Sequence, residues 1–323
     1  MKKNITYLCM AAAALLASSC TQNEEITPTE EKSGIPVEFI AKNVIDLETR
    51  AVMTSDTWQR YHKIGITMLA EDGTVLDANN IYKIGNSADD QTTASLVPEN
   101  EDDKLYYPTN GSNVIFRAYC LHQTEAVNNK LTIDLTSLTM TQNGAMDLMT
   151  ATSTATNENT EGPVELQFEH RFALLDLMAT SVLAEGGNPT IDNTYMEKTT
   201  VSLSNQYGKV EYDITTDELT PVGEKVTLEC VLRGVVGGYG VEFYLVPGIV
   251  EAEASQLTFV VGDEYNSTFV ANLPAGTYER GKKYSYTARL IQTETEGSFS
   301  GGWGDWTPAT IEDNELNPTE VVD

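Results

Sequence analysis

Apolar and polar residues alternate through most of this chain from residue 36 onward. Every second side chain of a strand lies on the same face, so a period of two predicts half-buried β-strands. Turn residues such as Asp72-Gly73 and Asn110-Gly111 separate the segments. The expected strands fall within residues 35–44, 62–72, 113–122, 130–135, 164–182, 199–214, 224–232, 239–248, 255–263, 266–273 and 282–293.

No apolar stripe of helical period is longer than two turns, so we expect an all-β chain. Many short strands about ten residues apart are typical of sandwiches and barrels, and 323 residues suffice for two such domains. The polar stretch 151–163 is the clearest linker-like gap. The sequence therefore predicts two tandem β-sandwich domains, at residues 36–165 and 166–323.

The first 35 residues have a different character. Two lysines precede a short apolar run and then small residues, which is typical of an export signal and too short to span a bilayer. The stretch that follows is acidic, polar and proline-containing, as in flexible tethers. We expect a signal peptide at residues 1–19 and a tether at residues 20–35.

Cys20, between these two segments, could be half of a disulfide, a metal ligand or a lipid attachment site. Its position favours lipidation: cleavage before Cys20 would leave it with a diacylglyceryl thioether and an N-acyl chain such as palmitate. Two or more such chains anchor a protein stably to a membrane. Glu24 and Glu25 are similar to an acidic signal for the outer face of the outer membrane; the alternative is that they only solvate the tether.

Charge, cysteines and motifs exclude several classes of function. With 20 basic and 48 acidic residues, the net charge of −28 repels a phosphate backbone, so nucleic acid is not expected as a partner. Cys120 and Cys230 could form a disulfide, but each lies in an apolar run and is better interpreted as a small buried hydrophobe. No CxxC or HxxxH spacing indicates a metal site.

The sequence also offers no convergent catalytic chemistry. It contains no G-x-S-x-G, HExxH, P-loop or dinucleotide-binding motif, so we expect neither an enzyme nor a cofactor, and a hydrolase is the weakest hypothesis. Trp303 and Trp306 could stack on a sugar ring. Packing over the end of a sandwich is the favoured interpretation of these two tryptophans.

Several segments, taken in order, carry a family resemblance. "PVEFIA", "TRAVMTSDTWQRYHKIGITM", "YYPTNGSNVIFRAY", "DLMTATST", "VELQFEHRFALLDL" and "FYLVPG" resemble the fimbrillins of Bacteroidales, the Mfa-like and FimA-like subunits of type V pili. The segment Tyr61-His62-Lys63 departs from the family's Gly-Asp, and the C-terminal segment from residue 297 does not align. The resemblance implies two transthyretin-like β-sandwich domains and a lipoprotein precursor.

The resemblance also implies a maturation step. Family members are cut after an arginine near the end of the first strand segment, and Arg50, followed by Ala51, is the matching residue. An arginine-specific protease would thereby release a strand with Val37, Phe39 and Ala41 on one face, and a neighbouring subunit would fill the gap by strand addition. The alternative is that this strand stays in place and Arg50 is an ordinary solvated loop residue.

The expected function is a stalk, tip or anchor subunit of a type V pilus that supports adhesion. Its partners would be other pilus subunits and, through the Cys20 lipid, the outer membrane until the chain is cut and enters the fimbrium. The second hypothesis is a non-polymerising surface lipoprotein that binds a glycan or host ligand.

Overall fold

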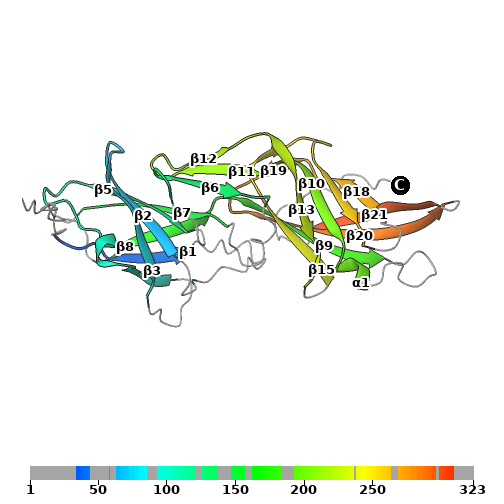
Figure 1. Ribbon diagram of the computed structural model, residues 1–323, viewed down its shortest axis with the longest axis horizontal. Coiled ribbons are helices and arrows are strands. Elements are labelled where there is room, and N and C mark those ends of the chain that lie inside the picture. Colours follow the sequence, from blue (N-terminus) through cyan, green and yellow to red (C-terminus); the bar gives the residue numbers. More distant parts are fainter. Residues whose placement is uncertain are drawn as a thin grey trace, which may run out of the picture. The chain divides into compact units, whose positions relative to one another are not determined.

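The computed structural model is almost entirely β-structure, which confirms the predicted class (Figure 1). No helix within the described part of the chain is long and apolar enough to cross a membrane. The expected turns are also present, since Gly73 and Gly111 have positive φ angles of 85° and 72°. The structure describes residues 34–43, 58, 63–85, 93–120, 126–136, 147–156, 162–182, 193–235, 238–262, 268–295 and 298–308.

Seven strands of the first half close into a barrel, in the order β1-β4-β3-β2-β5-β7-β8. Their alternating apolar residues point inward and form one core, with Ile64, Ile66 and Phe116 almost completely buried. The sheet therefore closes on itself where two separate sheets were expected. The strands are β1 (Phe39–Asn43), β2 (Lys63–Ala70), β3 (Val75–Ile84), β4 (Thr93–Pro98), β5 (Val114–Cys120), β7 (Met149–Ala155) and β8 (Val164–His170).

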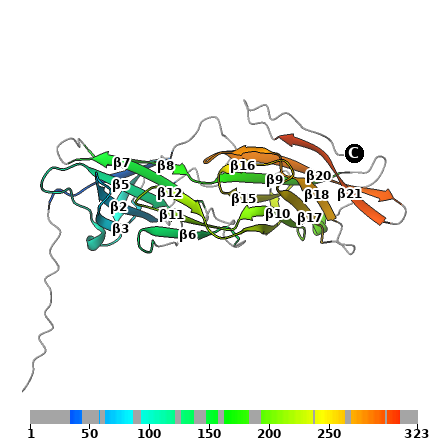
Figure 2. The same cartoon turned by 90° about the horizontal axis from the view of Figure 1, so that it is seen from above.

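Two further sheets enclose a second core, to which both contribute, for example Leu203 from one sheet and Leu177 from the other. The first has the order β13-β10-β17-β18, with β10 (Thr200–Tyr207), β13 (Lys225–Val231), β17 (Gln256–Val260) and β18 (Thr268–Asn272). The second has the order β14-β15-β9-β20-β21, with β9 (Ala173–Val182), β14 (Arg233–Val235), β15 (Gly238–Leu245), β20 (Lys283–Thr295) and β21 (Ser298–Pro308) (Figure 2).

A third sheet joins the two halves of the sequence. Strand β6 (Lys130–Asp134) pairs with β11 (Lys209–Asp213), which pairs in turn with β12 (Glu218–Pro221). A third hydrophobic cluster includes Leu131, Tyr212 and Tyr244. The expected boundary at residue 165 falls inside β8, and the division into two transthyretin-like domains stays a prediction.

Short elements complete the described chain. They are the 3-10 turn Glu101–Asp103, the helix α1 (Asn193–Met196), and the pair β16 (Gly248–Val250) and β19 (Gly276–Tyr278). Cys120 lies in the barrel core and Cys230 in the second core; both are buried thiols, as the sequence favoured, and they form no disulfide with each other. Burial raises the pKa of the Cys120 thiol to about 12, with a smaller contribution from Asp147.

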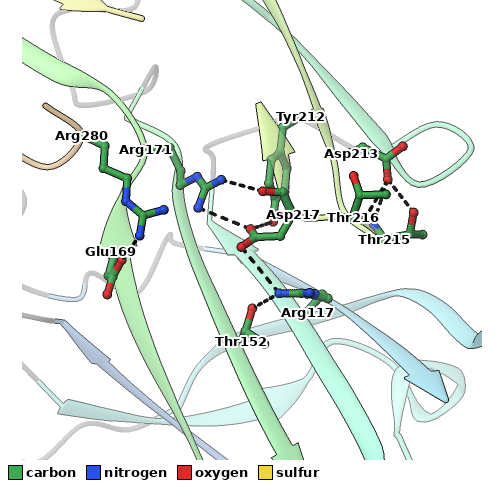
Figure 3. A network of polar contacts seen from close by, with 10 residues as sticks. All are labelled: Arg117, Thr152, Glu169, Arg171, Tyr212, Asp213, Thr215, Thr216, Asp217 and Arg280. Atoms are coloured by element: carbon green, nitrogen blue, oxygen red, sulfur yellow. Dashed lines mark hydrogen bonds and ion pairs between the residues drawn. The ribbon is translucent and has the colours of Figure 1, made fainter. Parts of the chain in front are cut away.

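A polar network connects the β11–β12 hairpin to the barrel (Figure 3). Asp217, in the turn of the hairpin, accepts a hydrogen bond from the Tyr212 hydroxyl at 2.9 Å. Its carboxylate lies 3.5 Å from Nη1 of Arg117 on β5 and 3.4 Å from Nη1 of Arg171, which follows β8. Arg117 also donates to Thr152 on β7. One carboxylate therefore links the hairpin to two arginines of the barrel region, Arg117 and Arg171.

Candidate functional site

The first strand, β1, occupies the position on which the predicted function depends. It is antiparallel to β4 on one side, where Phe39 faces Leu96 and Ala41 faces Ala94. It is parallel to β8 on the other side, with Phe39 opposite Val164. A closed barrel has no free edges. Taking β1 away would therefore open the barrel and leave β4 and β8 with unpaired backbone groups.

The side chains of β1 and of the residues just before it alternate as the sequence predicted. Val37, Phe39 and Ala41 are 5%, 2% and 0% exposed and belong to the barrel core. Between them, Glu38 is exposed and Ile40 half-buried. Burying the side chains of Val37 and Phe39 contributes about 1.5–3 kcal/mol each. The inward face of this segment therefore occupies an apolar groove between β4 and β8, as a bound ligand would.

The Phe39 ring packs between two aromatic rings of the barrel core. Its centroid lies 5.3 Å from the Tyr82 ring of β3 and 5.0 Å from the Phe116 ring of β5, both edge-to-face. The Tyr82 hydroxyl accepts a hydrogen bond from the Leu105 amide at 3.0 Å. Because the Tyr82 ring is buried, its pKa is raised to about 12. Two residues further along, the small side chain of Ala41 has no exposed surface, and its register partners are Ala94 on β4 and Leu166 on β8.

Backbone bonds fix the segment before β1. The Val37 amide donates to the Leu105 carbonyl, and the Tyr107 amide donates to the Ile35 carbonyl, both at 2.9 Å. On the outer face, Lys42 Nζ lies 2.6 Å from Glu165 Oε1 on β8. This ion pair is exposed and contributes little. The apolar side chains and the two backbone ladders therefore hold β1.

Trp58 marks the return of the chain to the barrel core. It is almost completely buried, and its ring centroid lies 5.1 Å from that of Phe168, the register partner of Asn43. Both ends of residues 44–57 are thus fixed at the barrel. The predicted cleavage site at Arg50 and Ala51 belongs to this segment and lies outside the described residues.

The structure brings together only one part of the predicted site. Val37, Phe39 and Ala41 share one buried face, whereas Cys20 lies outside the described residues. Trp303 and Trp306 belong to the edge strand β21, where Trp303 is the register partner of Leu290; their side chains lie outside the description.

The sequence did not show which strands would flank β1. Strand β8 lies within the predicted segment 164–182, whereas β4 was not predicted, although residues 93–98 alternate; that β1 would lie between these two strands was not visible in the sequence. Tyr82 and Phe116 carried no distinguishing signal. Within the described residues, no group of three or more His, Cys, Asp or Glu side chains is arranged to hold a metal ion.

Comparisons with known proteins concern the chain as a whole. Residues 49–306 match the family described as fimbrillin-like. A relative from Bacteroides uniformis, the "Putative fimbrium subunit Fim1C", is 28% identical over 313 residues, covering 95% of this chain and 96% of that protein.

Two solved structures of similar fold also come from Bacteroides species. A "putative cell adhesion protein" from Bacteroides uniformis has a TM-score of 0.59 at 23% identity, covering 84% of this chain and 98% of that one. Another from Bacteroides ovatus has a TM-score of 0.58 at 18% identity, covering 87% and 100%. At these identities the similarity concerns the fold alone.

Proposed function

Because this chain belongs to the fimbrillin-like family, we propose that it is a fimbrium subunit that is exported as a lipoprotein and assembled by strand exchange. The relative described as a fimbrium subunit, similar over nearly the full length, supports this role. The fimbrium lies at the cell surface, and the role is structural and adhesive, not enzymatic. Such a subunit belongs to the stalk, the tip or the anchor of the fimbrium.

The placement of β1 is the observation that carries the proposal. This strand closes the barrel, yet the chain continues to the next fixed residue, Trp58, only through residues 44–57. A cut after Arg50 would turn β1 into a ligand held by non-covalent contacts alone. The same cut would separate the Cys20 lipid from the rest of the protein, so the membrane anchor would be lost with the strand.

The vacated groove would favour a strand from another subunit. Strands β4 and β8 would both present unpaired N–H and C=O groups, which attract a further strand. The apolar pockets of Val37, Phe39 and Ala41 would select an incoming segment with apolar residues at every second position. We propose that the C-terminal segment of a neighbouring subunit supplies it.

Limited digestion of the full chain tests the maturation step. A trypsin-like protease should cut first after Arg50, giving a new N-terminus at Ala51 by sequencing, and the product should form multimers that resist SDS. Arg50→Ala should prevent both, whereas Arg60→Ala is the matched control and should not. A cut product that stays monomeric would favour the second hypothesis, a surface lipoprotein, and glycan arrays with Trp303→Ala and Trp306→Ala would then test it.

An engineered, reducible disulfide between β1 and β4 tests whether β1 is the exchanged strand. Ala41 and Ala94 are buried register partners on β1 and β4, so Ala41→Cys with Ala94→Cys should form a disulfide that holds β1 after cleavage. Multimers should then appear only after reduction. A second pair, Ser202→Cys with Glu229→Cys, joins β10 to β13 and is the control. If the oxidised first pair polymerises like the control, β1 is not the exchanged strand.

A further inference from the structure

Two acidic side chains and one basic side chain lie close together on the five-stranded sheet β14-β15-β9-β20-β21. Glu242, Asp176 and Lys283 come from the adjacent strands β15, β9 and β20 (Figure 2). Asp176 is the register partner of Glu242 on one side and of Ser285 on the other. Lys283 lies two residues before Ser285, and its Nζ is 2.9 Å from Oδ2 of Asp176. The nitrogen is thus already in contact with the carboxyl group.

This ion pair is unusually well buried. The Lys283 side chain is 9% exposed and that of Asp176 is 21% exposed, whereas Lys42, Lys63 and Lys130 are between 36% and 56% exposed in their pairs with glutamates. Apolar groups surround the lysine: Leu174 is its register partner, and Tyr244 is the next residue across the sheet. Both are almost fully buried. Burying two charges costs desolvation energy that an uncharged bond would avoid.

Glu242 provides an acid beside the pair. Burial raises its pKa above the ordinary value, and the carboxylates of Asp176 and Asp147 raise it further, while Lys283 and Arg233 lower it. A raised pKa increases the fraction of the neutral carboxyl near neutral pH. Such a group can both give and take a proton, as a general acid–base does.

We propose that Lys283 and Asp176 form an intramolecular amide cross-link, with Glu242 as the proton carrier. The ammonium of Lys283 first gives one proton to the Asp176 carboxylate. The Nζ lone pair then attacks Cγ of the resulting carboxylic acid, forming a C–N bond and a tetrahedral intermediate. Glu242 donates its proton to the departing hydroxyl, which leaves as water, and takes a proton back from Nζ. One ammonium and one carboxylate become one amide and one water.

Proximity is the reason that this condensation can proceed without an activating co-reactant. Groups held in contact by a folded structure react as if at effective concentrations of roughly 10⁵–10⁸ M. Register and burial hold Asp176 and Lys283 in this way. The exposed pair of Lys130 and Glu211 lacks these apolar surroundings, and the acid beside it, Asp213, has a pKa below the ordinary value instead of above it.

The cross-link would join two parallel strands that lie far apart in the sequence. Strand β9 follows the barrel directly, and β20 leads into the edge strand β21. A covalent bond at the start of both strands would resist a pulling force that hydrogen bonds alone would bear. This inference depends on the sheet and not on strand exchange, so it holds or fails independently of the proposed function.

Tandem mass spectrometry of the protein recovered from cells tests the cross-link. Trypsin should yield residues 172–198 joined to residues 283–289, with a mass lower by one water than the sum of the two peptides. The cut after Lys283 should be absent. Finding these peptides only in unlinked form, with Lys283 cleaved normally, would overturn the proposal. Locating the bond excludes water loss elsewhere, for example at Asp72-Gly73.

Variants assign the roles of the three residues. Lys283→Arg and Asp176→Ala should abolish the branched peptide, and Glu242→Gln should strongly reduce its yield in protein of the same age. Lys130→Arg, in the exposed pair with Glu211, is the matched control and should leave the yield unchanged. An unchanged yield in Glu242→Gln would overturn the role of Glu242 while leaving the bond itself to the wild-type measurement, which needs no variant to fold.

Discussion

Arg171 holds Asp217 at two points. Its Nη2 donates to the main-chain oxygen of Asp217 at 2.7 Å, and its Nη1 lies 3.4 Å from the carboxylate (Figure 3). Asp217 has a φ of 62°, in the left-handed region that residues other than glycine seldom adopt. The two contacts offset this unfavourable conformation and fix the β11–β12 hairpin, on which β6 also depends.

Arg171→Ala should lower the free energy of unfolding by about 2–3 kcal/mol. Removing one partner of a fully buried pair costs about 3–5 kcal/mol, and Asp217 remains partly exposed, which reduces the effect. The shift of the urea midpoint measures it. Arg280→Ala is the control, because Arg280 and Glu169 are both more than half exposed, and it should change stability by about 0.5 kcal/mol or less. Equal losses in the two variants would contradict the role of the network.

Phe39→Ala should destabilise the uncut chain by about 3–5 kcal/mol, because it removes a buried ring and leaves a cavity between Tyr82 and Phe116. Ile40→Ala, on the half-buried face of the same strand, should cost less than half as much. Thermal unfolding of both variants checks this. If the two residues cost the same, β1 is not held by its inward face.

Part of the first half could be predicted because its physics is local. The alternation of Val37, Phe39 and Ala41 is visible in the sequence, and a strand with one apolar face must bury it. The closure of the barrel is not local. It depends on the parallel pairing of β1 with β8, more than 120 residues away (Phe39 with Val164), and no residue type encodes such a partner.

The run 164–182 shows why a domain boundary is hard to place. It forms one uninterrupted strand-like segment in the sequence, yet it divides at Arg171 into β8 and β9. Leu166 faces the barrel core, Leu174 the third cluster and Leu175 the second core. Both faces of β9 are buried at its start, so the period of two disappears there. The pair of Lys283 and Asp176 could not be predicted either, because only the sheet register brings β20 beside β9.

Stability should fall in alkaline solution partly through Tyr82. Its pKa is about 12 in the folded protein and 10.0 for the ordinary side chain, so the fold favours the neutral form. This contribution is complete below pH 10 and is lost as the pH rises toward 12. Tyr82→Phe should be less stable at pH 7, because the Leu105 amide loses its acceptor at a cost of about 1–3 kcal/mol. Urea midpoints measured between pH 9 and 12 should fall less steeply for this variant than for the wild type.

The two buried cysteines should report separately on the two cores. Thiolates react with alkylating agents and thiols do not, so the pKa of about 12 and the burial of Cys120 should keep it unlabelled in the folded, uncut chain at pH 8. Cys120 shares the barrel core with Phe39, whereas Cys230 lies in the second core. Release of β1 after cleavage at Arg50 should therefore speed the labelling of Cys120 and leave that of Cys230 unchanged. Mass spectrometry of iodoacetamide-treated protein measures both rates. Arg50→Ala treated with the same protease is the control, and parallel acceleration at both cysteines would indicate general unfolding instead of the loss of one strand.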